Sequence, residues 1–271
     1  MKSLPTITMI TPSYNQGQFI DQTIQSVLSQ EYPDLQYLVI DGGSDDKTLD
    51  ILRQYNGQLQ WISESDRGQS HAINKGLDMA TGHIIGYLNS DDIMEPGALR
   101  RVGEFFAIHP EAAWVTGKCR TVDQNGKEIR KFITRYKNFW LRFRSYKVLT
   151  ILNYISQPAT FWRREVTDVV GPLNEDWNYV MDYDYWLRIG RDFKLWVLAA
   201  YLAQFRYYPS SKSGSTANRQ FDEELRAAER LGVSSTFMLL HSLHNRLVIS
   251  AYRLNMSQGK PASVISKAVI K

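Results

Sequence analysis

The chain has 271 residues, of which 43% are hydrophobic and 22% are charged, which suits one large folded domain with a substantial core. Its net charge of +4 is compatible with an anionic ligand or a membrane surface but requires neither. Cys119 is the only cysteine, which excludes an intramolecular disulfide and favours a reducing compartment. No stretch approaches the roughly 20 apolar residues of a membrane-spanning helix. Pro5 breaks the short N-terminal apolar run, so we expect a cytoplasmic protein without a signal peptide.

Strand and helix patterns alternate along the first 110 residues. Strands are predicted over residues 6–11, 35–43, 59–64 and 83–88. Helical spacing of apolar residues follows over residues 19–28, 44–55, 72–80 and 96–110, with Ser44 as one N-cap and Gly82 at one C-cap. This alternation predicts an α/β, Rossmann-like domain with a mostly parallel central sheet flanked by helices.

Polar residues follow these strands where each strand ends. They are Ser13-Tyr14-Asn15, Asp41-Gly42-Gly43, the Glu64, Asp66 and Arg67 loop, and Asn89-Ser90-Asp91-Asp92. Because ligands of such sheets bind at the carboxyl ends of the strands, we expect these loops to converge on one site. The adjacent carboxylates of Asp91 and Asp92 repel each other, and a bound cation or water would reduce this repulsion. The plain alternative is that they only cap the next helix.

The pattern changes after residue 110. Two strands are predicted over 112–117 and 119–123, and Asn125-Gly126 predicts a hairpin turn leading into residues 128–136. A helix is predicted over 181–193, and a polar loop at 210–219 precedes two C-terminal helices.

Five sequence segments occur in an order and at spacings that together form a family pattern. They are "TPSYNQGQFIDQTIQSVLSQEYPDLQYLVIDGGSDDKT", "SESDRGQSHAINKGLDMATG", "YLNSDD", "SQPATFWRR" and "MDYDYWLRIG". Together they resemble the inverting glycosyltransferases of family 2, over roughly residues 5 to 215. The resemblance implies one type A domain, with residues 1–110 as the nucleotide-sugar-binding half, 111–215 as the acceptor-binding half and 216–271 as a helical extension. It implies transfer of a sugar from a nucleoside diphosphate sugar to an acceptor hydroxyl with inversion, in polysaccharide or glycoconjugate synthesis. The expected donor is a UDP-sugar.

The resemblance also implies a donor site. Its residues are Pro12, Tyr14, Asp41, Asp66, Arg67, Asn74, Ser90 and Asp91. Asp41 matches the aspartate that accepts a hydrogen bond from the base, Tyr14 an aromatic beside the base, and Ser90 a position near the ribose. From the residues alone, Asp41 satisfying its own turn stays open. For Arg67 and Asn74, an ion pair or an exposed polar role stays open.

Asp91 matches the metal-binding position of the family. Mg²⁺ and Mn²⁺ prefer oxygen ligands, and such an ion bridging the diphosphate would act as a Lewis acid. The first acidic position of the motif is Asn89 here, so the expected divalent metal depends mainly on Asp91.

Asp182 matches the general base of the family, with Met181 where a glutamate often stands. General base catalysis is worth about 10²–10⁴-fold. Asp184 is a competing candidate, about 200° around the helix, and a purely helix-terminal charge is the plain alternative for Asp182. Gln157 and Trp162 are expected to border the acceptor pocket.

The remaining features leave several partners open. The loop at 210–219 is expected to close over the donor, with Lys212 or Arg219 near the diphosphate. The basic, aromatic "NFWLRFRSYK" favours a flap or a membrane-facing patch over nucleic acid, which we do not expect as a partner. An apolar stripe of Leu240, Leu243, Leu247, Ala251 and Leu254 suits a core, a second copy or peripheral contact with the inner face of a membrane.

For a transferase we expect a glycan or a lipid-linked molecule as the acceptor. Two other functions stay open at this point. A sugar-phosphate nucleotidyltransferase needs a basic glycine-rich loop after the first strand, and "TPSYNQGQF" has no basic residue. A non-catalytic nucleotide-sugar or glycan-binding protein is the other.

Overall fold

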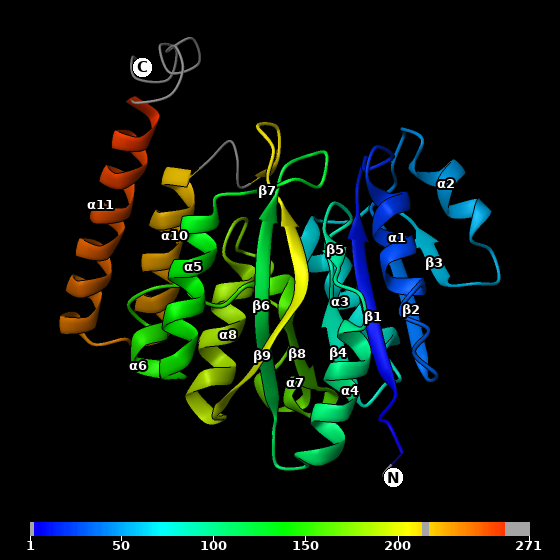
Figure 1. Ribbon diagram of the computed structural model, residues 1–271, viewed down its shortest axis with the longest axis horizontal. Helices are drawn as coiled ribbons and strands as arrows, with labels where there is room; N and C mark the ends of the chain where they lie inside the picture. The colour runs from blue at the N-terminus through cyan, green and yellow to red at the C-terminus, as the bar shows by residue number, and fades with distance from the viewer. Residues whose placement is uncertain (1–2, 213–216, 258–271) are drawn as a thin grey trace.

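A nine-stranded mixed sheet forms the centre of the computed structural model, which describes residues 3–212 and 217–257 (Figure 1). Its strands are β1 (Ile7–Ser13), β2 (Leu35–Asp41), β3 (Gln60–Ser63), β4 (Ile84–Tyr87), β5 (Ile93–Met94), β6 (Trp114–Val122), β7 (Glu128–Ile129), β8 (Thr160–Arg163) and β9 (Leu195–Arg206). The order is β3-β2-β1-β4-β8-β6-β9-β5, with β7 on β6. β3, β2, β1 and β4 are parallel, and β8 is antiparallel to both β4 and β6. The predicted mostly parallel sheet is confirmed.

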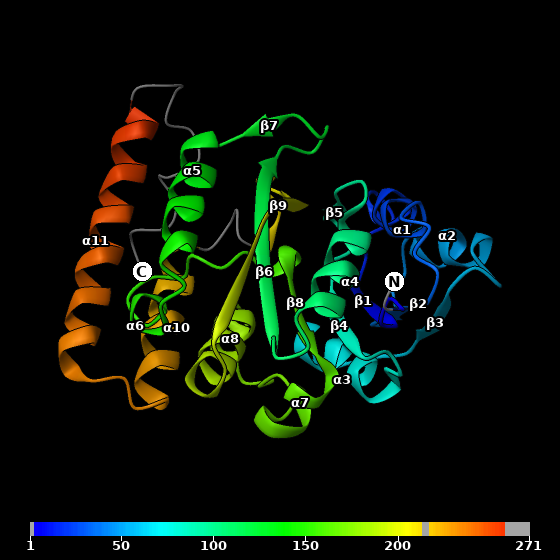
Figure 2. The ribbon, with the colours of Figure 1, turned by 60° about the horizontal axis from the view of Figure 1, so that its bottom comes forward.

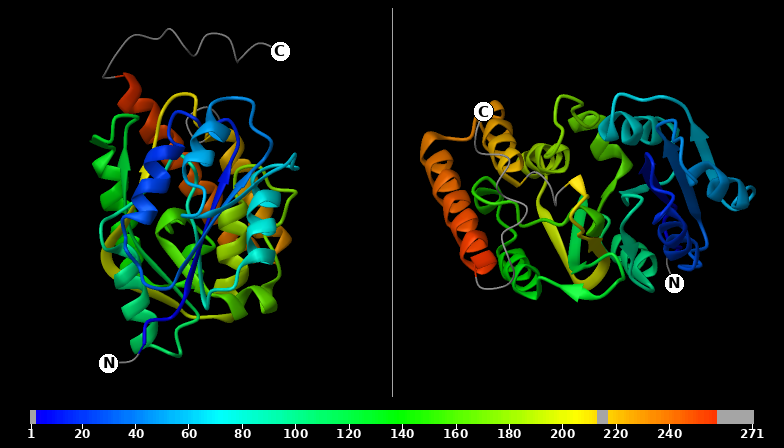
Figure 3. Two further views of the ribbon diagram at one scale, coloured as in Figure 1. Left: turned by 90° about the vertical axis from the view of Figure 1, so that its right-hand side faces the viewer. Right: turned by 90° about the horizontal axis from the view of Figure 1, so that it is seen from above.

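Helices cover both faces of this sheet. They are α1 (Ile20–Leu28), α2 (Thr48–Gln54), α3 (Gln69–Met79), α4 (Ala98–Ile108), α5 (Lys131–Trp140), α6 (Tyr146–Leu149), α7 (Arg164–Val170), α8 (Met181–Asp192), α10 (Ala217–Arg230) and α11 (Ser235–Ser257), with 3-10 turns η1 (Leu141–Phe143) and η2 (Gln157–Ala159). Side chains alternate along β1, so that Ile7 and Met9 enter one core with α1 and α4 while Ile10 enters the other with α3 and α8. α1 and α3 accordingly lie on opposite sides of β1 (Figure 3).

Several predicted boundaries move for local reasons. α2 begins at Thr48 rather than Ser44, because the Ser44 hydroxyl is hydrogen-bonded to Asp41 instead of capping the helix. Gly82 is not a C-cap, since α3 ends at Met79. A Cβ on Gly82 would lie 2.6 Å from the backbone nitrogen of Thr8, so this glycine permits close strand approach.

The second half also departs from the prediction in detail. The strands expected at 112–117 and 119–123 are one strand, β6. The Asn125-Gly126 hairpin is confirmed, with Gly126 at φ 81°, but β7 stops at Ile129 and α5 replaces the rest of the predicted strand.

The two predicted C-terminal helices are confirmed as α10 and α11. Together with α5 they lie at one end of the molecule, away from β1, β2 and β3 (Figure 1). The Tyr136 hydroxyl of α5 lies 2.7 Å from Nε2 of His244 on α11. Within residues 3–212 and 217–257, no helix has the length and apolar character to cross a bilayer.

Candidate functional site

The loop after β4 is held in place from α1. It carries Asn89, Ser90, Asp91 and Asp92 at the carboxyl end of the strand. The Thr23 hydroxyl of α1 is shared between the carbonyl oxygens of Ser90 (2.9 Å) and Asp92 (2.7 Å). These contacts fix the loop backbone, and Ser90 is itself buried.

Arg206, at the end of β9, holds the same loop from the other side. Its backbone N–H donates to Oδ1 of Asp92 (2.8 Å), and its Nε donates to the carbonyl oxygen of Asp91 (2.7 Å). The guanidinium is buried over the ring of Phe19, 4.5 Å from the centroid. Sequence reasoning missed Arg206, and its only signal was a cation ending an otherwise apolar strand.

The two adjacent carboxylates play different parts. Asp92 is fully buried; burial and the charge of Asp91 raise its pKa well above the ordinary range. Burial also raises the pKa of Asp91, opposed by the Tyr208 hydroxyl, which donates to Oδ2 (3.0 Å), and by the Arg206 charge. Oδ1 of Asp91 accepts no hydrogen bond from the described residues.

This donor set fits a hard divalent cation. Mg²⁺ often uses one or two protein carboxylates and takes its other ligands from phosphates and water. Asp91 offers one open carboxylate oxygen at the sheet edge. In the part of the chain that the structure describes, no cluster of three or more His, Cys, Asp or Glu could hold a metal by itself.

Asp41 ends β2 in register with Ser13 and Ser63 of the neighbouring strands. It is fully buried and accepts hydrogen bonds from the N–H groups of Gly43 (3.1 Å) and Ser44 (2.9 Å) and from the hydroxyls of Ser44 and Ser63 (2.6 Å each). The four hydrogen bonds match the alternative in which Asp41 satisfies its own turn, with one further contact from β3.

Asp66 comes from the loop after β3 and lies against Gly42, the residue that follows Asp41. Its Oδ1 accepts the N–H of Gly68 (2.7 Å). Its Oδ2 lies against Gly42, so close that a Cβ there would be 2.7 Å away, and it accepts no hydrogen bond from the described residues. Tyr14, just past the end of β1, is 62% exposed. This edge thus presents an open carboxylate oxygen and an open aromatic face.

Other expected donor residues are engaged elsewhere. Arg67 forms an ion pair with Glu175 (Nη2 to Oε2, 2.8 Å). Asn74 donates to the carbonyl of Leu173 and accepts its N–H, both at 2.9 Å, which ties α3 to the loop after α7. Arg67 thus forms the ion pair that was left open as an alternative, and Asn74 bonds to backbone groups across the fold. Pro12 is buried inside β1.

Asp182 lies in the first turn of α8, partly exposed, with Oδ1 accepting the N–H of Tyr183 (2.8 Å). Burial raises the pKa of Asp182 to about 6, with Lys137 opposing and Glu224 reinforcing the rise. A carboxylate with a pKa near neutrality suits proton abstraction.

Asp184, the competing candidate, has a different environment. It is buried and ion-paired with Nε of Arg188 (2.9 Å). The same guanidinium donates to the carbonyls of Val170 and Pro172. Asp184 therefore fixes α8 against the end of α7, and Asp182 is the carboxylate left open.

A chain of hydrogen bonds links the surroundings of Asp182 to the loop after β4. It runs from Lys212 Nζ to Gln69 Oε1 (3.3 Å), from Gln69 Nε2 to Asn89 Oδ1 (2.7 Å), from Asn89 Nδ2 to Gln157 Oε1 (3.4 Å), and from Gln157 Nε2 to the Tyr87 carbonyl (2.6 Å). The charge of Asp182 acts on the pKa of both Tyr87 and Lys212. Asn89 thus serves as a hub between two halves of the site.

Trp162, expected to border the acceptor pocket, lies in the core. It is fully buried, its indole N–H donates to the Thr167 hydroxyl (3.0 Å), and it packs on Tyr87, Tyr185 and Trp186. Aromatic residues near a motif are as suited to a core as to a pocket.

The predicted closing loop is described only in part. Lys212 belongs to the hydrogen-bond chain above and Arg219 lies on α10, whereas residues 213–216 lie outside the described ranges.

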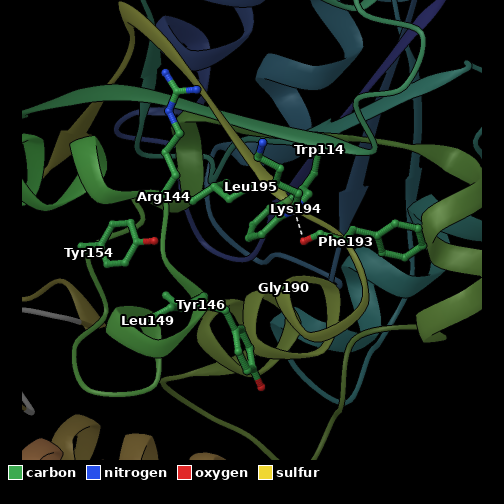
Figure 4. Close-up of a pocket in the computed structure, with 9 residues that line it drawn as sticks. All are labelled: Trp114, Arg144, Tyr146, Leu149, Tyr154, Gly190, Phe193, Lys194 and Leu195. Atoms are coloured by element: carbon green, nitrogen blue, oxygen red, sulfur yellow. Dashed lines mark hydrogen bonds between the residues drawn. The ribbon is translucent and has the colours of Figure 1, made fainter.

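A cavity of about 210 Å³ lies elsewhere, where β6 and β9 begin (Figure 4). Trp114 and Leu195 start those strands, and the indole N–H of Trp114 donates to the Phe193 carbonyl (3.1 Å). Because β6 runs parallel to β9 and in the direction of β4, the cavity opens at the sheet edge opposite the loop after β4. None of the candidate site residues lines it.

Similarity to known proteins bears on this site. The family model described as glycosyl transferase family 2 matches residues 8–171. An uncharacterised glycosyltransferase of Nostoc sp. is 26% identical over 93% of this chain and 79% of its own length. A glycosyltransferase named for teichuronic acid biosynthesis in Bacillus subtilis is 35% identical over 48% of this chain, a match spanning about half (52%) of its own length.

Two solved structures share the fold. The mannosyltransferase PcManGT of Pyrobaculum calidifontis, in complex with GDP-Man and Mn²⁺, matches 96% of this chain and 77% of its own, with a TM-score of 0.68 and 18% identity. S. aureus TarS with UDP-GlcNAc matches 82% of this chain and 65% of its own, with a TM-score of 0.65 and 18% identity. With the family match over more than half of its length, the chain belongs to glycosyl transferase family 2 and has the type A fold.

Proposed function

We propose that this glycosyltransferase moves a sugar from a nucleoside diphosphate sugar to an acceptor hydroxyl in one in-line displacement with inversion. Asp182 removes the proton of the attacking hydroxyl. The observation that carries this assignment is the position of Asp182, a partly exposed carboxylate in the first turn of α8 that forms no ion pair among the described residues. Burial raises its pKa to about 6, which suits a general base. Asp184, two residues later, is buried in an ion pair and cannot take this part.

Asp91 would hold the divalent cation, Mg²⁺ or Mn²⁺, with its carboxylate, of which only Oδ2 accepts the Tyr208 hydroxyl. The bound ion would supply Lewis-acid stabilisation of the leaving diphosphate. The chain's own contribution is to hold Asp91 in place, with Arg206 and Thr23 fixing the loop backbone and Tyr208 orienting the carboxylate. The Mn²⁺ in the mannosyltransferase structure supports this proposal.

Asp66 and Tyr14 bind the nucleobase. The open Oδ2 of Asp66 would accept an imide N–H, and the exposed ring of Tyr14 would stack on the base. The imide N3–H of uracil and the lactam N1–H of guanine can both donate in this way, so the pairing is compatible with UDP-sugars, the expected class, and with GDP-sugars. The UDP-GlcNAc and GDP-Man of the two similar structures fit that range.

Lys137 and Lys212 lie near Asp182, the proposed general base, on the acceptor side of the site. The Lys137 charge lowers the pKa of Asp182, and Asp182 in turn opposes the depression of the Lys212 pKa. Two cations beside the Asp182 carboxylate would favour its ionised form near neutral pH. They would also attract an acceptor that carries negative charge. The name of the Bacillus relative, which refers to teichuronic acid biosynthesis, supports a polysaccharide or glycoconjugate acceptor.

The nucleotidyltransferase alternative has little support in the loop after β1. The N–H groups of Asn15, Gln16 and Gly17 are already taken by the side chains of Ser44, Thr48 and Asp46. No phosphate cradle of free N–H groups remains in that loop.

The test is Asp182→Asn, measured by transfer and by donor binding. We expect transfer to fall by at least about 10²-fold while the donor dissociation constant stays within a factor of three. The matched control is Asp168→Asn, which removes an exposed carboxylate from α7 and should leave both quantities unchanged. Equal loss of donor binding in Asp182→Asn would contradict the assignment, and so would unchanged transfer. Absence of any turnover in the wild type would favour the non-catalytic binder.

A further inference from the structure

Charge is strongly segregated along the chain. Residues 129–164 and 231–271 hold 14 of the 32 Lys and Arg and none of the 28 Asp and Glu. The remaining residues, with 18 cations against 28 anions, carry a net charge of −10. The modest overall charge therefore hides two purely basic segments in an acidic protein, and α5, η1 and α11 lie in those segments.

α5 and η1 expose aromatic side chains on one side. Phe132 (75% exposed), Phe139 and Phe143 recur at helical spacing and point away from the core. Exposed cations lie beside this strip at Lys131, Arg135 and Arg142. The opposite side of α5 faces inward, with Thr134 buried and Lys137 near Asp182.

α11, which contacts α5, also exposes apolar side chains. Leu239, Leu240, Leu243 and Leu247 (71% exposed) form its outward side. Of the three alternatives left open for the stripe, the core-facing one therefore does not hold for Leu240, Leu243 and Leu247, and the side chains of Ala251 and Leu254 lie outside the described ones. α5 and α11 lie side by side (Figure 2), joined by the stacked rings of Tyr136 and His244 at 6.1 Å. We call the three phenylalanines and four leucines the Phe–Leu face.

An exposed apolar face of this extent marks a docking surface. We propose that the Phe–Leu face docks on an anionic lipid bilayer. Phenylalanine and leucine side chains enter the boundary between headgroups and acyl chains, and the flanking lysines and arginines neutralise lipid phosphates. The acidic remainder of the protein would be repelled by the same surface, which leaves one orientation favoured.

Charge argues against a second copy of the chain as the occupant. Pairing two Phe–Leu faces would bring two basic rims together with no carboxylate in either segment to offset them. Four of the seven side chains are leucines, which have no ring to stack on bases, and this disfavours nucleic acid. An anionic bilayer matches both the apolar strip and its rim.

Docking would also position the site. α5 carries the Phe strip on its outer side and Lys137, beside Asp182, on its inner side. A membrane-bound α5 therefore holds the acceptor side of the site close to the lipid surface. The proposal goes beyond the transfer reaction, because a chain that transfers nothing would still present this face.

Co-sedimentation with vesicles tests it. The wild-type chain should bind vesicles of phosphatidylcholine with roughly 30% phosphatidylglycerol at least tenfold more tightly than pure phosphatidylcholine vesicles. Raising the salt to about 0.5 M should weaken binding severalfold by screening. The triple variant F132S/F139S/F143S should lose tenfold or more of the affinity at unchanged circular dichroism.

The controls separate this proposal from others. R53Q/R100Q removes two exposed cations from α2 and α4 and should bind like the wild type. Asp182→Asn should also bind like the wild type, so loss of transfer and loss of docking are distinguishable. Equal binding to both vesicle types, no binding, or binding indifferent to the Phe substitutions would overturn the proposal. So would concentration-dependent dimerisation in light scattering that the Phe substitutions abolish.

Discussion

The close approach of Gly42 and Asp66 allows a sharp test of the proposed nucleobase contact. A Cβ added at Gly42 would lie 2.7 Å from Oδ2 of Asp66. In Gly42→Ala the carboxylate must therefore move by roughly 0.5–1 Å to reach ordinary contact. A hydrogen bond to a charged group contributes about 1.5–3 kcal/mol, so its loss should weaken donor binding by about 10- to 150-fold.

Isothermal titration with the nucleoside diphosphate would measure this loss without turnover. Gly42→Ala and Asp66→Ala should both weaken binding, and the effects should not add, because both remove one contact. The exchange variant G42D/D66G, which returns a carboxylate to the same space from the other strand, should recover part of the affinity. Wild-type affinity in Asp66→Ala, or fully additive losses, would refute the assignment.

Four further substitutions test separate parts of the account. Asp91→Ala should abolish the dependence of donor affinity on Mn²⁺, measured with and without chelator. Arg206→Met removes a buried cation beside the buried Asp92 and the half-buried Asp91, and should cost about 3–5 kcal/mol in urea unfolding, against under about 0.5 kcal/mol for the exposed Arg53→Met. Trp162→Phe should lower stability with no change in acceptor KM, since Trp162 lies in the core. Lys137→Met removes a charge that lowers the pKa of Asp182, so the acid limb of kcat should move to higher pH.

The alternation of strands and helices was enough to predict the sheet and its site-bearing edge. Buried strands and amphipathic helices leave period-2 and period-3.6 patterns that a single sequence displays. Predicted helix boundaries were wrong where a side chain had two possible partners. Ser44, for example, forms a hydrogen bond with Asp41 and does not cap α2. Such a choice depends on contacts across the fold and leaves no local pattern.

The site was harder to predict than the fold for a related reason. A motif gives residue types at the right places, but it does not say which oxygen stays open. Asp41 has its hydrogen-bonding capacity filled by its own turn and Ser63, while Asp66 reaches the space above Gly42 from another loop. Arg206 and Lys137 come from β9 and α5, far from any motif, and only the packing of those elements brings them to the site.

The pH dependence of kcat tests the central claim, that Asp182 is the base, most directly. The base must be ionised to accept the proton, so kcat should rise with pH along a limb of apparent pKa about 6 and then level off. The limb should vanish in Asp182→Asn. A wild-type profile that is flat between pH 5 and 8, or an unchanged limb in Asp182→Asn, would contradict the account.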